Sequence, residues 1–242
     1  MSAGVVAALA AEARTLGPSV KRGDGLSILS DGTLVAVSGI GAAAAARAAL
    51  ALVDAGATRL VSWGMAGGLD PALPAGTICI PGSVTARDGT RFGTDPHWRE
   101  LVGAVILRGR AVVGRTLLTN PLAIEDVAGK AAAFRDTGAD VVDMESLGVA
   151  QVAVSRGLPF LVVRVVVDTA ADRLPEAVLA ASSGGEVRIA RLLQELLRRP
   201  GDLLPLLRLA RRYRAAMRAL VAVARTGALA PTFATPSASR IA

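Results

Sequence analysis

Short runs of β-branched residues alternate with Ala-rich stretches along most of the chain. The short runs are almost continuously apolar, as in strands buried on both faces of a sheet, and the Ala-rich stretches have the helical period. Strands are predicted at 4–9, 26–30, 33–38, 59–63, 76–84, 111–118, 139–143 and 159–167. Helices are predicted from the loop 38–41 to about 55, and at 97–107, 123–135, 145–156, 174–182, 186–199 and 203–225, with an irregular surface loop at 85–97. This alternation predicts an α/β fold with three layers, α/β/α, around a mostly parallel mixed central sheet.

The distribution of strands predicts one large domain followed by an appendage. Residues 1–199 contain every predicted strand and form the main domain. Pro200 and Gly201 interrupt the helical pattern, and residues 200–225 are predicted to be a basic amphipathic C-terminal helix. Residues 226–242 are small, polar and Pro-containing, which predicts a mobile tail.

Composition narrows the chemistry that this chain can perform. Apolar residues make up 52% of the sequence, but no apolar run reaches the roughly 18–20 residues of a membrane span. The N-terminus shows no signal-peptide pattern, so a cytoplasmic location is expected. Cys79 and His97 are each the single residue of their type, which argues against a disulfide, a zinc site and a His-based triad. Acid–base chemistry is therefore expected from carboxylates, with no metal and no cofactor.

The net charge of +7 comes from one segment of the chain. Residues 186–225 carry ten Arg against three acidic residues, and the rest of the chain balances at 17 basic and 17 acidic residues. Nucleic-acid binding is not expected, since it favours basic residues along a binding face with aromatics for stacking. Two interpretations of 203–225 remain: a domain helix with a solvated Arg face, or a helix that contacts anionic lipid peripherally at the inner membrane surface.

Acidic residues and glycines follow several of the predicted strands. Glu12 follows the first strand, Glu145 and Asp168 follow the strands at 139–143 and 159–167, and the glycine-rich stretch 64–68 follows another. Ligands of parallel sheets bind at the carboxyl ends of strands, so these residues are site candidates. Each acid alone is more often a helix cap.

Five stretches in this order resemble the nucleoside phosphorylase and nucleosidase superfamily. They are AALAAEARTL, SGIGAAAAARAA, SWGMAGGLDPALPAGTICIP, VVDMES and LPFLVVRVVVDTAAD. Their spacing is similar to that of 5′-methylthioadenosine/S-adenosylhomocysteine nucleosidases, from residue 4 to about 172. The segments GGLDPALPAG, DMES and LLRRPGDLLPLLRLARRYRAAMRAL are similar to the hopanoid-associated phosphorylase family.

This resemblance implies a nucleoside phosphorylase-like catalytic domain that cleaves a purine N-glycosidic bond, with adenine as the base. The closer family implies adenosylhopane as substrate, in hopanoid side-chain biosynthesis, giving adenine and ribosylhopane or its phosphate. The alternatives are a 5′-methylthioadenosine/S-adenosylhomocysteine nucleosidase and a non-catalytic lipid- or nucleoside-binding protein. The superfamily also implies a homo-oligomer.

The resemblance assigns roles to individual residues. Asp168 would protonate N7 of the purine, Glu145 would bind the ribose hydroxyls and face the developing cation, and Glu12 would activate the attacking water. Met144 would pack against the sugar, whereas Asp143 would be structural. The other positions expected to bind substrate are Arg164, Gly67, Met65 and Gly41.

Three points depend on residues near these positions. Arg164 precedes Asp168 by four residues, on the same face of a regular strand, and would orient or pair with it.

Phosphorylases of the superfamily carry an Arg and a Ser where this chain has Ser62 and Met65, which favours water over inorganic phosphate as co-substrate. Arg47, or an Arg of a partner subunit, could still supply an anion site. The base pocket is expected near residues 117–123.

Overall fold

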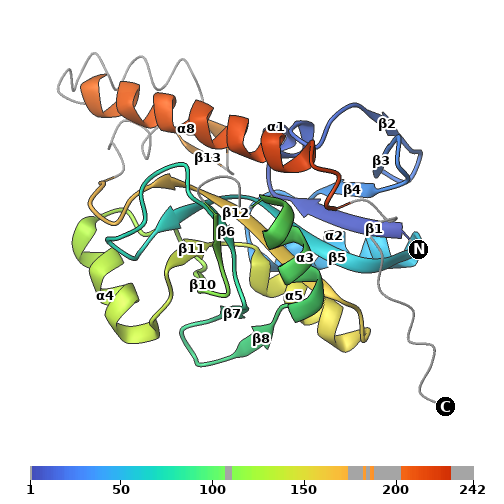
Figure 1. Cartoon of the computed structure of the whole chain (residues 1–242), viewed down its shortest axis with the longest axis horizontal. Coiled ribbons are helices and arrows are strands. Elements are labelled where there is room, and N and C mark those ends of the chain that lie inside the picture. Colours follow the sequence, from blue (N-terminus) through green and yellow to red (C-terminus); the bar gives the residue numbers. More distant parts are fainter. Residues whose placement is uncertain (1, 107–110, 174–181, 184–185, 188–202, 230–242) are drawn as a thin grey trace.

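The computed structural model describes residues 2–106, 111–173, 182–183, 186–187 and 203–229 (Figure 1). These residues form a twelve-stranded mixed sheet, a separate two-stranded sheet and flanking helices. The strands are β1 (Ser2–Ala7), β2 (Ser19–Lys21), β3 (Ser27–Leu29), β4 (Leu34–Val37), β5 (Ala57–Gly68), β6 (Ile78–Ile80), β7 (Ser83–Thr85), β8 (Arg91–Gly93), β9 (Ala111–Val113), β10 (Thr116–Thr119), β11 (Val141–Asp143), β12 (Phe160–Asp168), β13 (Ser182–Ser183) and β14 (Glu186–Val187). The helices are α1 (Ala10–Arg14), α2 (Ala42–Asp54), α3 (Pro96–Ile106), α4 (Val127–Thr137), α5 (Ser146–Ser155) and α8 (Leu203–Ala224).

Four parallel strands form the centre of the sheet, in the order β4-β1-β5-β12. Val5 of β1 lies opposite Val35 of β4 and Val61 of β5, and all three are buried. Antiparallel pairs surround this centre, where β3 joins β4, β11 joins β5, β8 joins β7 and β6 joins β12. Because parallel strands end at the same edge, the segments that follow β1, β5 and β12 come together there.

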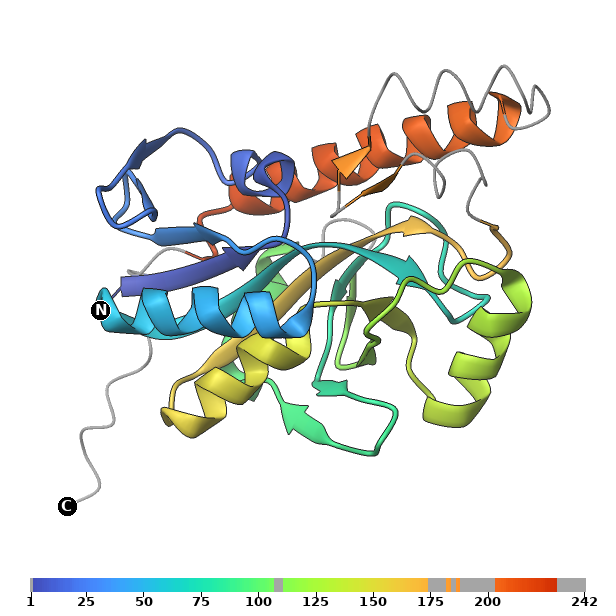
Figure 2. The ribbon, with the colours of Figure 1, turned by 180° about the vertical axis from the view of Figure 1, so that it is seen from behind.

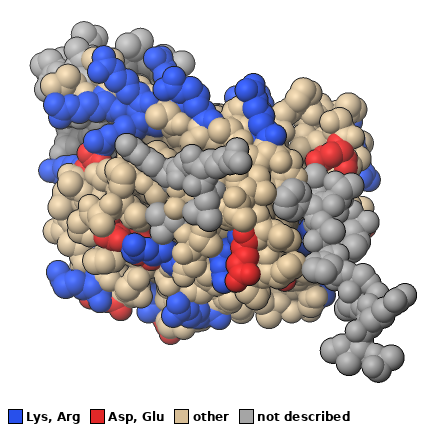
Figure 3. All heavy atoms as spheres, in the orientation of Figure 1, with Lys and Arg blue, Asp and Glu red and all other residues tan. Residues whose placement is uncertain are grey.

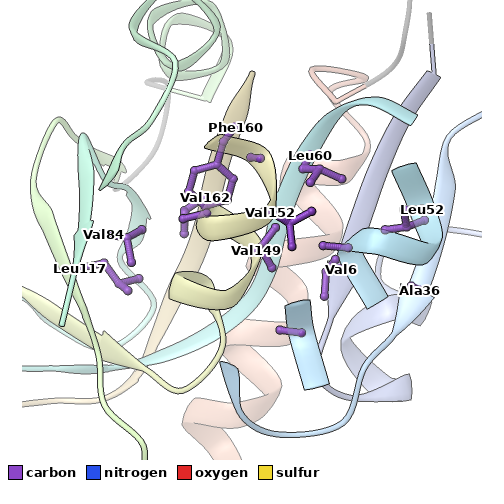
Figure 4. Packing of buried hydrophobic residues seen from close by; sticks show 14 of the residues in the cluster. Val6, Ala36, Leu52, Leu60, Val84, Leu117, Val149, Val152, Phe160 and Val162 are labelled. Carbon is purple, nitrogen blue, oxygen red and sulfur yellow. The ribbon is translucent and has the colours of Figure 1, made fainter. Parts of the chain in front are cut away.

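Helices cover both faces of the sheet, which confirms the three-layer α/β/α prediction (Figures 1 and 2). On one face, α2 and α5 pack against the strands, and Figure 4 shows Val149 and Val152 of α5 among Leu60, Phe160 and Val162 of the sheet. On the other face, α3 and α8 complete a second cluster of buried residues. These two clusters hold the central strands in place from both sides.

The helix α8 belongs to this second cluster. Ala216, Leu220 and Val223 are buried among residues of β1, β5 and β12. The exposed side of the helix is basic, and Figure 3 shows Lys and Arg side chains gathered over it. No helix in the described part of the chain combines the length and the apolar composition needed to cross a bilayer.

Two predicted strands are each divided in the structure. The prediction at 76–84 becomes β6 and β7, separated by Pro81 and Gly82, because proline donates no backbone hydrogen bond. The prediction at 111–118 becomes β9 and β10, separated at Gly114, whose φ of 84° turns the chain. The divided halves pair with different neighbours: β6 with β9, and β7 with β10.

Other predictions differ from the structure in extent. The glycine-rich stretch 64–68 continues the strand β5 and is not a turn. The predicted loop 85–97 contains β8, and the sequence analysis missed α1 and β2. Ser182, Glu186 and Val187, predicted to be helical, lie instead in the antiparallel pair β13–β14. The other residues of the helices predicted at 174–182 and 186–199, and residues 230–242 of the predicted tail, lie outside the described residues.

Candidate active site

A cavity of about 210 Å³ lies between helix α1 and the ends of β5, β11 and β12. Its wall includes six of the residues selected from the sequence: Glu12, Met65, Gly67, Met144, Glu145 and Asp168. The other two, Gly41 and Arg164, are not part of this wall and instead contact Glu145. The structure thus brings together residues that are far apart along the chain.

Glu12 enters the cavity from the first turn of α1. Its Oε2 accepts a hydrogen bond from the backbone N–H of Leu9 at 3.0 Å, and its Oε1 accepts one from the N–H of Met65 at 2.9 Å. Burial raises the pKa of Glu12, and the nearby Arg164 guanidinium partly opposes that effect. A carboxylate with increased proton affinity, fixed by two backbone amides, is suited to act as a general base.

Gly64 of β5 makes this position of Glu12 possible. A Cβ atom at residue 64 would lie 2.5 Å from Glu12 Oε1 and would collide with the guanidinium of Arg164. The backbone φ of 155° at this residue also favours glycine. The glycine-rich stretch therefore allows a carboxylate and a guanidinium to approach the strand backbone.

Glu145 stands at the N-terminus of α5. Its Oε1 accepts a hydrogen bond at 3.0 Å from the N–H of Gly41, the residue that precedes α2. Burial and the Asp143 carboxylate raise the pKa of Glu145 to about 7, against the opposing effect of Arg164. The glycine-containing loop 38–41 thus donates a backbone hydrogen bond to the Glu145 carboxylate.

Arg164 lies at the centre of a buried polar network below the cavity wall. Its Nη2 is 2.6 Å from Asp143 Oδ2 and 3.7 Å from Glu145 Oε2. The same nitrogen donates to the Ser62 hydroxyl at 2.9 Å, which in turn lies 2.9 Å from the Ser146 hydroxyl. Asp143 also accepts a hydrogen bond from Ser146. These contacts fix the junction between β11 and α5, from which Glu145 projects.

The prediction that Arg164 orients or pairs with Asp168 is wrong. The pairing of β12 with β5 shifts after Val166, so that Asp168 lies opposite Gly67 and residue 167 is skipped. This irregularity removes the alignment that residues four apart have in a regular strand. Arg164 pairs with Asp143 instead, and Asp168 pairs with Lys130.

Lys130 of α4 is the site residue that the sequence analysis missed. Its side chain is 1% exposed, lines the cavity and forms an ion pair with Asp168. Burial raises the pKa of Asp168, and the charge of Lys130 opposes this effect. A signal was present in the sequence, because Lys130 precedes Ala133 and Phe134 by three and four residues and therefore shares their helix face, which packs inward.

The mouth of the cavity is apolar. Ile40 and Leu122 line the cavity and are 39% and 72% exposed. Leu122 and the adjacent Ala123 come from the segment 117–123, where the base pocket was expected. Arg47, considered as an anion ligand, is exposed on α2 and is not among the residues that line the cavity.

Comparison with known proteins places this architecture in a family. Residues 2–198 match the pattern of the Phosphorylase superfamily. No curated protein matches the sequence.

Solved structures with the same fold are available for comparison. Futalosine hydrolase of Helicobacter pylori strain 26695 is 14% identical with a TM-score of 0.69, covering 93% of this chain and 96% of its own. The 5′-methylthioadenosine/S-adenosylhomocysteine nucleosidase of Colwellia psychrerythraea 34H, in complex with adenine, is 20% identical with a TM-score of 0.68, covering 95% and 96%. The corresponding nucleosidase of Campylobacter jejuni is 17% identical with a TM-score of 0.68, covering 93% and 98%.

These similarities agree with the architecture described above. The solved structures share the fold at low identity, and the family pattern extends over most of the chain, from β1 through β12. The chain belongs to the Phosphorylase superfamily.

Proposed function

We propose that this protein cleaves the N-glycosidic bond of a purine nucleoside by hydrolysis. The observation that carries the proposal is the convergence of Glu12, Glu145 and Asp168 on one cavity, each with its pKa raised by burial. Glycosidic cleavage needs an acid for the leaving group and a base for the nucleophile, and carboxyl groups with raised pKa values suit both tasks near neutral pH.

The residues divide these tasks as follows. Asp168 gives a proton to N7 of the base while the electron pair of the C1′–N9 bond moves onto the purine. Glu145 accepts hydrogen bonds from the ribose hydroxyls, and its negative charge stabilises the developing ribosyl cation more than the neutral ground state. Glu12 takes a proton from the water whose oxygen bonds to C1′. Gly67, Met65 and Met144 form the wall against which the nucleoside rests.

The charge of the cavity supports water rather than phosphate as the nucleophile. Among the described residues that line it, Lys130 is the one lysine or arginine, and its ammonium already binds Asp168 and two backbone carbonyls. Four carboxyl groups share the wall: Glu12, Asp143, Glu145 and Asp168. A phosphate dianion would meet repulsion there without a free cationic ligand among the described residues that line the cavity.

The shape of the site supports an adenine nucleoside with a large apolar 5′ substituent, such as adenosylhopane. The cavity of about 210 Å³ is smaller than most ligand pockets, which measure roughly 300–1,000 Å³, so a polycyclic tail would have to extend through the mouth. The exposed Ile40 and Leu122 would contact such a tail there. A 5′-methylthioadenosine/S-adenosylhomocysteine nucleosidase is the second candidate, since the structures compared above include such enzymes.

We also propose that α8 contacts anionic lipid at the inner membrane surface, and that the protein forms a homo-oligomer. Leu204 and Leu207 are exposed on this helix. Residues 203–224 contain several arginines and no acidic residue. Basic and apolar residues together favour binding at an interface. A peripheral position would bring the cavity near a lipid-linked substrate.

The assay for this function follows adenine release from detergent-dispersed adenosylhopane and, separately, from methylthioadenosine. Adenine from adenosylhopane alone would support the lipid-linked substrate, and adenine from methylthioadenosine alone would favour the second candidate. Adenine from neither, with retained binding of the nucleoside, would favour a non-catalytic binding protein. Glu145→Gln serves as the variant without the anionic side chain, and Glu125→Gln on the exposed surface is its control.

A further inference from the structure

We propose that Lys130 is a positioning residue that holds Asp168 for protonation of the base and replaces the proton that Asp168 gives up. The inference rests on the proposed function and adds a component that neither the sequence motifs nor the fold assigns. Three observations carry it: the burial of the ammonium, the direction of its three hydrogen bonds, and the access of Asp168 to the cavity.

The buried ammonium of Lys130 directs all three of its hydrogen bonds to one segment of the chain, residues 168–172. Its Nζ donates to the Asp168 carboxylate, to the carbonyl oxygen of Thr169 at 2.9 Å and to the carbonyl oxygen of Asp172 at 3.0 Å. Three donors and three acceptors satisfy the group, as a buried charge requires. Lys130 therefore fixes the end of β12 and the following turn as one unit.

Asp168 lines the cavity beside Gly67 of β5. A Cβ at Gly67 would stand 3.4 and 3.5 Å from the two carboxylate oxygens, in van der Waals contact with them. The carboxylate thus lies between a cation on one side and the cavity on the other.

The other charged groups around this pair are already engaged. The Asp172 carboxylate accepts hydrogen bonds from the N–H and hydroxyl of Thr169 and pairs with Arg212 of α8. The other acids of the cavity wall are also engaged: Asp143 and Glu145 contact Arg164, and Glu12 accepts hydrogen bonds from two backbone amides. Lys130 is therefore the cation directly bonded to Asp168 among the described residues.

This arrangement resolves a conflict in the proposed mechanism. Burial increases the proton affinity of Asp168, but its ion pair with the Lys130 ammonium favours the carboxylate form, which has no proton to give to a base. As the C1′–N9 bond breaks, an N–H bond of Lys130 breaks and an O–H bond forms on Asp168, while a proton passes from Asp168 to N7. Lys130 is left neutral, Asp168 is again a carboxylate, and Lys130 regains its proton from solvent after the base departs.

Steady-state kinetics of Lys130→Met and Lys130→Arg test this role, with Arg135→Met on the exposed side of the same helix as the control. We expect kcat of Lys130→Met to fall about 10²-fold, within the range of general acid catalysis, while KM changes less than about threefold. The deficit should shrink as the pH falls, because solvent then protonates Asp168 directly. Lys130→Arg should recover the melting temperature and KM but not kcat, because a guanidinium keeps its protons.

The kcat of a double variant that combines Lys130→Met with Asp168→Asn gives a second, independent test. If Lys130 acts through Asp168, the double variant should be no slower than Asp168→Asn alone. Full recovery of kcat by Lys130→Arg, a deficit independent of pH, or additive losses in the double variant would overturn the inference and leave Lys130 as a structural anchor. These results presuppose base release by the unmodified protein; its absence would instead overturn the proposed function, and this inference with it.

Discussion

Arg212 of the C-terminal helix pairs with Asp172, whose backbone carbonyl accepts a hydrogen bond from Lys130 at 3.0 Å. Through Arg212 and Asp172, the basic helix is therefore connected to the ion pair of Lys130 and Asp168 at the cavity. Together with the buried Leu220 and Val223, this contact makes α8 part of the support of the site. The proposed contact of α8 with membrane must accordingly be tested with exposed residues rather than by deleting the helix.

The Arg212–Asp172 contact should influence catalysis weakly. Arg212→Gln removes a partly exposed ion pair, and such pairs are worth about 0.2–1 kcal/mol. If the contact stabilises the productive position of Lys130 by that amount, its loss should lower kcat by up to about fivefold with little change in KM. Arg211→Gln, on the exposed side of the same helix, is the matched control and should leave kcat unchanged. Equal effects of the two substitutions would show that general charge, rather than this contact, matters.

Glu145→Gln should change stability with a defined dependence on pH. The pKa of Glu145 is about 7 in the folded protein, above its ordinary value of 4.5, so the folded state retains the proton between these values. Stability from this group is fully present below pH 4.5 and is lost as the pH rises through 7. The free energy of unfolding of Glu145→Gln relative to the unmodified protein should therefore increase over this interval, by up to about 3 kcal/mol. Urea unfolding at pH 5 and pH 8 measures the difference, and a gap independent of pH would contradict the assignment.

The same substitution should lower activity. Removing the negative charge that faces the ribosyl cation should reduce kcat by about 10²-fold or more. In the unmodified protein, kcat/KM should rise as the pH increases through about 7, as Glu145 ionises. A profile of kcat/KM against pH tests this, and retention of full activity by Glu145→Gln would remove Glu145 from the site.

Gly64→Ala should disrupt the site through collision. The added methyl group would lie 2.5 Å from Glu12 Oε1 and would displace Glu12 and Arg164 together. We expect a loss of about 2–4 kcal/mol in stability, as for overpacked or strained buried positions, and at least a 10²-fold loss in kcat. Gly25→Ala is the control, because Gly25 has a φ of 82° but nothing within 4 Å of an added Cβ. It should cost about 1 kcal/mol and leave kcat intact.

Base release should not depend on phosphate. Because the cavity wall carries several carboxyl groups and one engaged lysine, adding inorganic phosphate should neither increase the rate nor yield a ribosyl 1-phosphate. Product analysis by phosphorus NMR distinguishes the two reactions. A phosphate-dependent rate would indicate an anion site beyond the described residues of the cavity wall, such as an Arg of a partner subunit.

Binding of α8 to anionic vesicles should depend on its exposed arginines. Replacing Arg208, Arg211, Arg214 and Arg218 with Gln removes four exposed positive charges without touching Arg212 or the buried side of the helix. Each basic residue near an anionic surface contributes roughly 1 kcal/mol, so co-sedimentation with phosphatidylserine vesicles should be lost. Co-sedimentation that persists in this variant, or that is absent in the unmodified protein, would remove the membrane proposal. Cleavage of methylthioadenosine, if present, should be unaffected.

Local sequence was sufficient for the layers of the fold and for the candidate acids. Continuous β-branched runs are typical of strands buried on both faces of a sheet, and the apolar period of the Ala-rich stretches indicates the helices that cover those faces. Glu12, Glu145 and Asp168 follow such strands, and strand ends converge in this topology, so their meeting at one cavity was predictable. Their catalytic roles remain predictions.

Partner choice was decided only by tertiary structure. The shift in pairing after Val166 turns Asp168 away from Arg164, and the segment around residue 130 lies 38 residues earlier in the chain, so spacing alone could not identify Lys130 as its partner. The need for glycine at residue 64 likewise arises from two side chains that approach from other elements. A sequence determines which segments are buried, because burial follows from local composition. It does not by itself determine which buried charges meet, because that depends on register shifts and helix placement of a few ångströms.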